Sequence, residues 1–165
     1  MIEEIEKTVP VVSAPEFREF GKIPRLKRDC VITEKIDGTN AQIWIPEDGA
    51  RVVSIGGLLP FLAGSRTRWI FPEADNAGFA AWAYQNAEEL LKHGPGSHFG
   101  EWWGCGIQRN YGLKEKRFSL FNTSRWVDQS RWAAEGLREP CGEKREYAPA
   151  CCGVVPVLYQ GPFST

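Results

Sequence analysis

Short stretches of alternating apolar and polar residues recur along this chain and constrain its fold more than any other feature. Ala41 to Ile45, Ser97 to Trp103 and Arg117 to Asn122 each alternate in the manner of a half-buried strand. One segment, about Asn76 to His93, instead has apolar residues at helical spacing, and Asp75 or Asn76 can cap its N-terminus. Several strands and one clear helix predict an α+β fold of antiparallel sheets with flanking helices.

The remaining predicted strands lie near the two ends of the chain and beside a turn. Cys30 to Thr33 and Val154 to Tyr159 are short apolar stretches typical of strands. Pro46-Glu47-Asp48-Gly49 predicts a hairpin turn, because Asp-Gly favours the backbone of a tight connection. Arg51 to Ile55 would then return antiparallel to the strand before the turn.

The composition is that of one globular domain, which we assign to residues 1–165. The net charge of -1 means that a nucleic-acid partner would have to be bound by a local basic patch. Five cysteines without regular spacing favour reduced thiols in a cytoplasmic protein over a disulfide framework. No apolar run approaches membrane-spanning length, and the acidic N-terminus is unlike a secretory signal.

Lys35 is the first candidate functional residue, because of the run Glu34-Lys35-Ile36-Asp37-Gly38-Thr39-Asn40 around it. A lysine held between two strands can act as a nucleophile towards the α-phosphorus of a nucleoside triphosphate. Arg66 and Arg68 can supply positive charge that favours the neutral amine which this attack requires. The alternative is an ordinary exposed lysine beside a turn, since K-x-D-G arises often by chance.

Two later strands carry side chains that suit a nucleotide. Glu101, within Phe99-Gly100-Glu101-Trp102-Trp103, can accept hydrogen bonds from ribose hydroxyls, although it can also be a solvated strand residue. Phe118 and Phe121 point to opposite faces of their strand. One of these rings can therefore pack in the core while the other covers an adenine.

In this order the segments resemble the phage-type ATP-dependent RNA ligases, within the covalent nucleotidyltransferase superfamily. The resemblance covers roughly residues 17 to 165, and the ordered set is more specific than any one motif. It implies the nucleotidyltransferase fold of a ligase adenylation domain. The matching segments are Glu34 to Asn40, Ser65 to Arg68, Phe99 to Glu101, Gly106 to Gln108, Phe118 to Asn122 and Val155 to Phe163.

The resemblance also implies a role for each matching residue. Lys35 would form the lysyl-AMP intermediate from ATP, with Mg²⁺ or Mn²⁺. Glu101 would contact the ribose and Phe121 would stack on adenine, with Phe118 as the second choice. Gln108 and Arg109 would bind RNA. The full set of predicted nucleotide-binding residues is Glu34, Ile36, Gly38, Asn40, Arg66, Glu101 and Phe121.

Asn122 departs from the family pattern, which commonly has aspartate there, and this puts the role of that side chain in doubt. Two basic runs are candidates for RNA phosphates, although solvated surface charge explains each of them equally well. The runs are Lys22, Arg25, Lys27 and Arg28, and Arg109, Lys114, Lys116 and Arg117.

These ligases carry two later motifs that do not follow the Val155 stretch in this sequence. One is E-G-[IV]-[IV], whose glutamate helps to bind the metal, and the other is K-x-K, whose lysines hold the triphosphate. Glu135-Gly136-Leu137-Arg138 shares only two letters with the first and precedes the Val155 stretch. The sequence therefore predicts a C-terminally incomplete domain with unknown metal ligands.

Three hypotheses remain open. The first is an RNA ligase domain that joins the 5′-phosphate and 3′-hydroxyl ends of nicked or broken RNA, as in RNA repair. The second is a truncated, non-catalytic chain that binds nucleotide or RNA, or one half of a split ligase that a C-terminal chain complements. The third is a DNA ligase-like nucleotidyltransferase.

Overall fold

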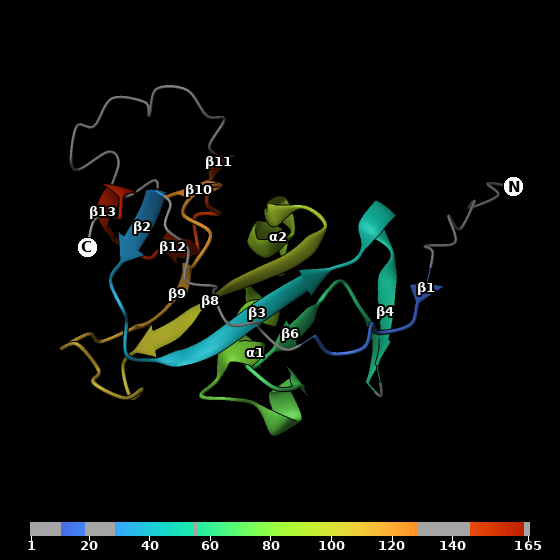
Figure 1. Cartoon of the computed structure of the whole chain (residues 1–165). Helices are drawn as coiled ribbons and strands as arrows, with labels where there is room; N and C mark the ends of the chain where they lie inside the picture. The colour runs from blue at the N-terminus through green and yellow to red at the C-terminus, as the bar shows by residue number, and fades with distance from the viewer. Residues whose placement is uncertain (1–10, 19–28, 55, 129–145, 164–165) are drawn as a thin grey trace, which may run out of the picture.

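The computed structural model describes residues 11–18, 29–54, 56–128 and 146–163 (Figure 1). A six-stranded sheet lies at the centre of this described part, with the order β12-β9-β8-β3-β6-β7. The four pairings from β9 to β7 are antiparallel, whereas β12 runs parallel to β9. The strands are β3 (Thr39–Ile45), β6 (Leu62–Gly64), β7 (Trp69–Ile70), β8 (Gly96–Gly104), β9 (Lys116–Leu120) and β12 (Cys152–Val154).

Smaller sheets in the described residues flank this central one (Figure 1). β4 (Arg51–Ser54) lies between β1 (Val11–Val12) and β5 (Gly57–Leu59). β2 (Asp29–Thr33) pairs antiparallel with β13 (Val157–Pro162). β10 (Trp126–Val127) pairs parallel with β11 (Glu146–Tyr147), and β1 pairs parallel with β4. The sheets are thus mixed, so the prediction of purely antiparallel sheets is wrong at the parallel pairs.

The helical segment is divided, and the prediction of one helix from Asn76 to His93 is wrong. The structure has α1 (Phe79–Gln85), α2 (Ala87–Leu90) and a 3₁₀ turn at Leu91–His93. Asn86 separates the two helices, because its side-chain amide donates to the Trp82 carbonyl at 2.8 Å and its backbone leaves helical geometry. Asp75 caps the N-terminus of α1, as predicted, because its carboxylate accepts the N–H groups of Ala80 and Ala81.

One face of the central sheet packs against α1 through a cluster of aromatic rings. Phe79 lies 5.0 Å from Phe118 and 5.4 Å from Trp102, measured between ring centroids. All three side chains are fully or almost fully buried. Trp82 packs against the same rings, at 4.9 Å from Trp102. This hydrophobic cluster packs α1 onto β8 and β9.

The predicted hairpin between Ala41–Ile45 and Arg51–Ile55 is absent from the described structure. β3 pairs with β6 along one edge and with β8 along the other, so neither edge is open to β4. The 3₁₀ turn Glu47–Gly49, with positive φ at Asp48 and Gly49, instead directs β4 into the separate three-stranded sheet. A second 3₁₀ turn, Pro72–Ala74, precedes α1.

The predicted strand from Val154 to Tyr159 is divided between two sheets. β12 ends at Val154 and β13 begins at Val157. Pro156 lies between them, and its ring nitrogen has no proton for a sheet hydrogen bond. Its carbonyl accepts the Glu34 N–H at 2.9 Å, which connects this break to the lysine-bearing run. The basic run from Lys22 to Arg28 lies outside the described residues.

Candidate functional site

The sheet face opposite the aromatic core carries an ordered set of polar and aromatic side chains. Asn40 on β3 pairs with Glu101 on β8, and Glu101 pairs with Ser119 on β9. Because side chains alternate along a strand, residues two positions away share this face. They are Gln42 on β3, Phe99 and Trp103 on β8, and Arg117 on β9.

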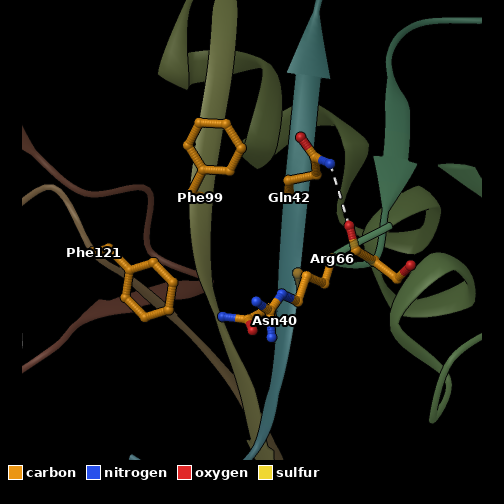
Figure 2. A pocket seen from close by; sticks show the side chains of 7 residues that line it. Asn40, Gln42, Arg66, Phe99 and Phe121 are labelled. Carbon is orange, nitrogen blue, oxygen red and sulfur yellow. Dashed lines mark hydrogen bonds between the residues drawn. The ribbon is translucent and has the colours of Figure 1, made fainter. Parts of the chain in front are cut away.

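A small pocket, open to solvent, lies at one end of this face. Figure 2 shows the rings of Phe99 and Phe121 on one side of it, with Gln42 and Arg66 on the other. Three of the residues predicted to bind nucleotide, Asn40, Arg66 and Phe121, therefore line one pocket. The complete lining is Asn40, Ala41, Gln42, Ser65, Arg66, Phe99 and Phe121.

A tight turn after β6 brings Arg66 to the pocket. The Ser65 N–H donates to the Arg68 carbonyl at 2.8 Å, and the Ser65 hydroxyl oxygen accepts the Arg68 N–H at 3.3 Å. The Gln42 side-chain amide donates to the Ser65 carbonyl at 3.2 Å, which fastens the turn to β3 (Figure 2). Arg66 is exposed, and its planar guanidinium suits a phosphate oxygen.

Glu101 connects the pocket to the lysine-bearing run. One carboxylate oxygen accepts the Gly38 N–H at 3.1 Å, and the other accepts the Asn40 side-chain amide at 3.3 Å. Burial raises the pKa of the Glu101 carboxyl above its ordinary value, whereas the Gly38 hydrogen bond and the Lys35 charge lower it. Each carboxylate oxygen has a second lone pair, so Glu101 can also accept a hydrogen bond from a bound hydroxyl.

Lys35 is exposed in the connection from β2 to β3. Its neighbour Ile36 is buried, with 8% of its surface exposed, and this anchors the run to the sheet. Gly38 allows the run to approach β8 closely, because a Cβ at this position would lie 2.5 Å from the Trp102 carbonyl oxygen. Ile36 and Gly38, both predicted to bind nucleotide, thus have clear packing roles in this structure.

A second, larger hollow also borders the run. It is open to solvent and is lined in part by Glu34, Ile36, Trp103 and Arg117. The run therefore borders both features: Asn40 lines the pocket, and Glu34 and Ile36 line the larger hollow.

The predicted RNA-binding residues lie on the loop between β8 and β9. Gln108 is exposed, and Arg109 is exposed but pairs with Asp37, with 3.1 Å from Nε to Oδ2. Two other members of the second basic run also have protein partners. Lys116 donates to the Ala77 carbonyl at 2.8 Å, and Arg117 pairs with Glu115.

The structure separates the two phenylalanines that the sequence left as candidates for adenine stacking. Phe121 lines the pocket, whereas Phe118 is fully buried against Phe79. Sequence reasoning missed Gln42 and Phe99 as pocket residues. Each lies two positions along a strand from a predicted site residue, Asn40 or Glu101, so strand alternation was a signal that could have identified both.

Within the described ranges, no group of three or more His, Cys, Asp or Glu side chains is arranged to hold a metal ion. The helices of this part of the chain are too short or too polar to cross a membrane.

The described part of the chain thus combines mixed sheets and few helices with an aromatic-lined polar pocket bordered by the lysine-bearing run. The model of the RNA ligase family matches residues 28–165. The chain belongs to the RNA ligase family, which confirms the family predicted from the order of the motifs. No curated protein matches the chain.

Solved structures of Naegleria gruberi RNA ligase share the fold. A variant with AMP and Mn and a variant with ATP and Mn are each 18% identical to this chain, with a TM-score of 0.50. Each match covers 84% of this chain and 39% of the other, so the chain spans well under half of their length.

Proposed function

We propose that this chain is the nucleotidyltransferase domain of an ATP-dependent RNA ligase, acting through a lysyl-AMP intermediate on Lys35. The observation that carries the proposal is the pocket that collects Asn40, Arg66 and Phe121 from three separate motifs. Glu101 joins this pocket to the Lys35 run through its two hydrogen bonds. Membership of the RNA ligase family supports RNA as the substrate.

Lys35 begins the proposed reaction. Its neutral amine attacks the α-phosphorus of ATP, a nitrogen–phosphorus bond forms, and the bond to the bridging oxygen breaks to release pyrophosphate. The proton on the nitrogen passes to solvent. An oxygen of an RNA 5′-phosphate then attacks the same phosphorus, the nitrogen–phosphorus bond breaks, and the Lys35 nitrogen takes back a proton from solvent. Finally, a 3′-hydroxyl attacks the adenylylated 5′-phosphate and loses its proton to solvent, the phosphoanhydride bond breaks, and AMP leaves as the RNA strand is joined.

The residues that line the pocket, and Glu101 next to Asn40, fit the parts of a nucleotide. Phe121 and Phe99 provide aromatic surface for a base, with base–aromatic stacking worth about 1–3 kcal/mol for each base. Arg66 can hold a phosphate oxygen, and Glu101 can accept a ribose hydroxyl. In the Naegleria gruberi structures the nucleotide is accompanied by Mn. We expect Mg²⁺ or Mn²⁺ to accompany ATP here and to neutralise phosphate charge.

Intact-mass spectrometry after incubation with ATP and Mg²⁺ tests the first step. The wild-type chain should gain one AMP, and Lys35→Ala should abolish the adduct. Lys92→Ala is the matched control, because Lys92 is an exposed lysine on the 3₁₀ turn after α2 and pairs with Glu89. A wild-type chain without an adduct, or an adduct that survives Lys35→Ala, would refute the proposal.

A second candidate is a chain that binds nucleotide or RNA and needs a further segment for catalysis. The match covers only 39% of the Naegleria gruberi chains, which favours it, and E-G-[IV]-[IV] and a later K-x-K are motifs that a further segment could supply. Translating the coding DNA beyond Thr165 tests this candidate, since an adjacent frame that encodes both motifs would support it. For a DNA ligase-like activity, sealing of nicked DNA is compared with sealing of nicked RNA by the same preparation.

A further inference from the structure

The loop between β8 and β9, residues 105–115, holds Asp37 of the lysine-bearing run at two points. The Tyr111 hydroxyl oxygen accepts the Asp37 backbone N–H at 2.7 Å. Arg109 pairs with the Asp37 carboxylate, at 3.1 Å from Nε to Oδ2. One loop thus engages both the backbone and the side chain of the residue two positions after Lys35.

The backbone of this loop adopts a conformation that ordinary residues avoid. Gln108, Asn110 and Tyr111 all have positive φ, at 45°, 61° and 49°. Such a left-handed conformation costs roughly 1–2 kcal/mol for each residue with a side chain, and it persists only where surrounding contacts determine it. Hydrogen bonds from Cys105 N–H to the Glu115 carbonyl (3.0 Å) and from Leu113 N–H to the Asn110 carbonyl (3.0 Å) close the loop.

The sheet itself sets the position of the Tyr111 ring. Trp103 on β8 meets it edge-on, with 5.2 Å between ring centroids and 83° between planes. Trp103 is in turn held by a hydrogen bond from its indole N–H to the Ser119 hydroxyl on β9, at 3.0 Å. The phenol therefore lies at the end of a chain of contacts that begins on the central sheet.

Two adjacent amides of the run are consequently held from two different elements. Glu101 on β8 accepts the Gly38 N–H, and Tyr111 on the loop accepts the Asp37 N–H. The Arg109–Asp37 pair contributes less, because both side chains are well exposed, at 77% and 49%, and exposed ion pairs are weak. The Tyr111 hydrogen bond is also exposed, but it is short, at 2.7 Å, and it acts directly on the backbone of the run.

We propose that Tyr111 is a positioning residue for Lys35, whose hydroxyl holds the run in the conformation that directs the lysine amine towards the nucleotide. The inference rests on the proposed function of Lys35 as the nucleophile. Tyr111 acts through the Asp37 amide and does not itself touch ATP. Its loss should therefore slow the attack by Lys35 more than it weakens ATP binding.

Tyr111→Phe tests this, because it keeps the ring against Trp103 and removes only the hydroxyl. Loss of one hydrogen bond of ordinary strength should lower the rate constant for AMP-adduct formation roughly 2- to 10-fold. The ATP concentration for half-maximal rate should stay unchanged, and the melting temperature should change little. Tyr147→Phe is the matched control: Tyr147 is an exposed tyrosine on β11, which pairs with β10 in a separate two-stranded sheet.

Amide hydrogen exchange, read on a peptide that contains Asp37, provides a measurement independent of catalysis. Tyr111→Phe should speed this exchange, whereas Tyr147→Phe should not. An unchanged exchange rate, or an unchanged rate constant for adduct formation in Tyr111→Phe, overturns the inference. If the wild-type chain forms no adduct, the proposed function fails, and the exchange measurement alone decides whether Tyr111 holds the run.

Discussion

Gly38→Ala is expected to destabilise the protein and slow adenylylation at the same time. A Cβ at position 38 would lie 2.5 Å from the Trp102 carbonyl oxygen and 2.7 Å from the Trp103 Cβ, whereas real Cβ atoms essentially never come within 3.0 Å of a neighbour. Neither of these atoms is at the far end of a flexible side chain. The substitution must therefore push the run away from β8.

The magnitude follows from the cost of forcing an extra methyl group into a packed site, about 1–3 kcal/mol. For a chain of this size, that corresponds to a melting temperature lower by roughly 2–12 °C. The same displacement lengthens the bond from the Gly38 N–H to Glu101, which is 3.1 Å in the structure. Since misplacing a reacting group by about 1 Å can cost 100-fold in rate, adduct formation should fall roughly 10- to 100-fold.

Thermal melting followed by circular dichroism, with intact-mass kinetics on the same samples, measures both effects. Gly56→Ala is the control, because a Cβ there meets nothing within 4 Å. Gly100→Ala should also destabilise, since its Cβ would lie 2.5 Å from the Ser119 carbonyl oxygen, but it lies on the core face and should slow the reaction less. If Gly38→Ala and Gly56→Ala have the same melting temperature, the packing argument is refuted.

Three further changes test other parts of the structure. Burial lowers the pKa of His93 to about 4, so its neutral form is favoured in the folded state. The contribution of His93 to the free energy of unfolding should be fully present above the unfolded pKa of about 6.5, and it should fall by about 3 kcal/mol as the pH drops to 4. Urea titrations at several pH values measure this, and a pH dependence that His93→Phe leaves unchanged would contradict it. Phe121→Ala should weaken ATP binding by about 1–3 kcal/mol in calorimetry, whereas Phe121→Tyr should retain the affinity. Equal ATP affinities of the wild type and Phe121→Ala would show that Phe121 does not contact the nucleotide. Asp75→Ala should lower the free energy of unfolding by about 1 kcal/mol, because the carboxylate accepts two N–H groups of α1, and an unchanged urea midpoint would show that the cap is dispensable.

The strands that depend on local alternation were predictable. Ser97 to Trp103 and Arg117 to Asn122 correspond closely to β8 and β9, and Cys30 to Thr33 corresponds to β2. Each of these stretches is short and rich in apolar or β-branched residues, a local signal that favours a strand whatever its partners are.

The predictions of secondary structure were wrong where strand pairing or a side-chain hydrogen bond overrides the local sequence pattern. Pro46 to Gly49 is a turn, as expected, but β3 already has β6 and β8 on its two edges, so β4 joins another sheet. Asn86 interrupts an otherwise helical apolar pattern by hydrogen bonding to the Trp82 carbonyl. Backbone pairing is nearly independent of residue type, so the identity of a strand's neighbours is poorly encoded locally.

The sequence by itself determined the family, the lysine-bearing run and the residue types that a nucleotide site requires. Only the tertiary structure decided which of them meet. The register of β3 against β8 sets Asn40 opposite Glu101, and the path of the chain after β9 brings Phe121 to the pocket while Phe118 enters the core. The contact between Tyr111 and Asp37 spans 74 positions of the chain. Such contacts depend on long-range packing and on a loop conformation that no local pattern specifies, which is why the structure was needed to find them.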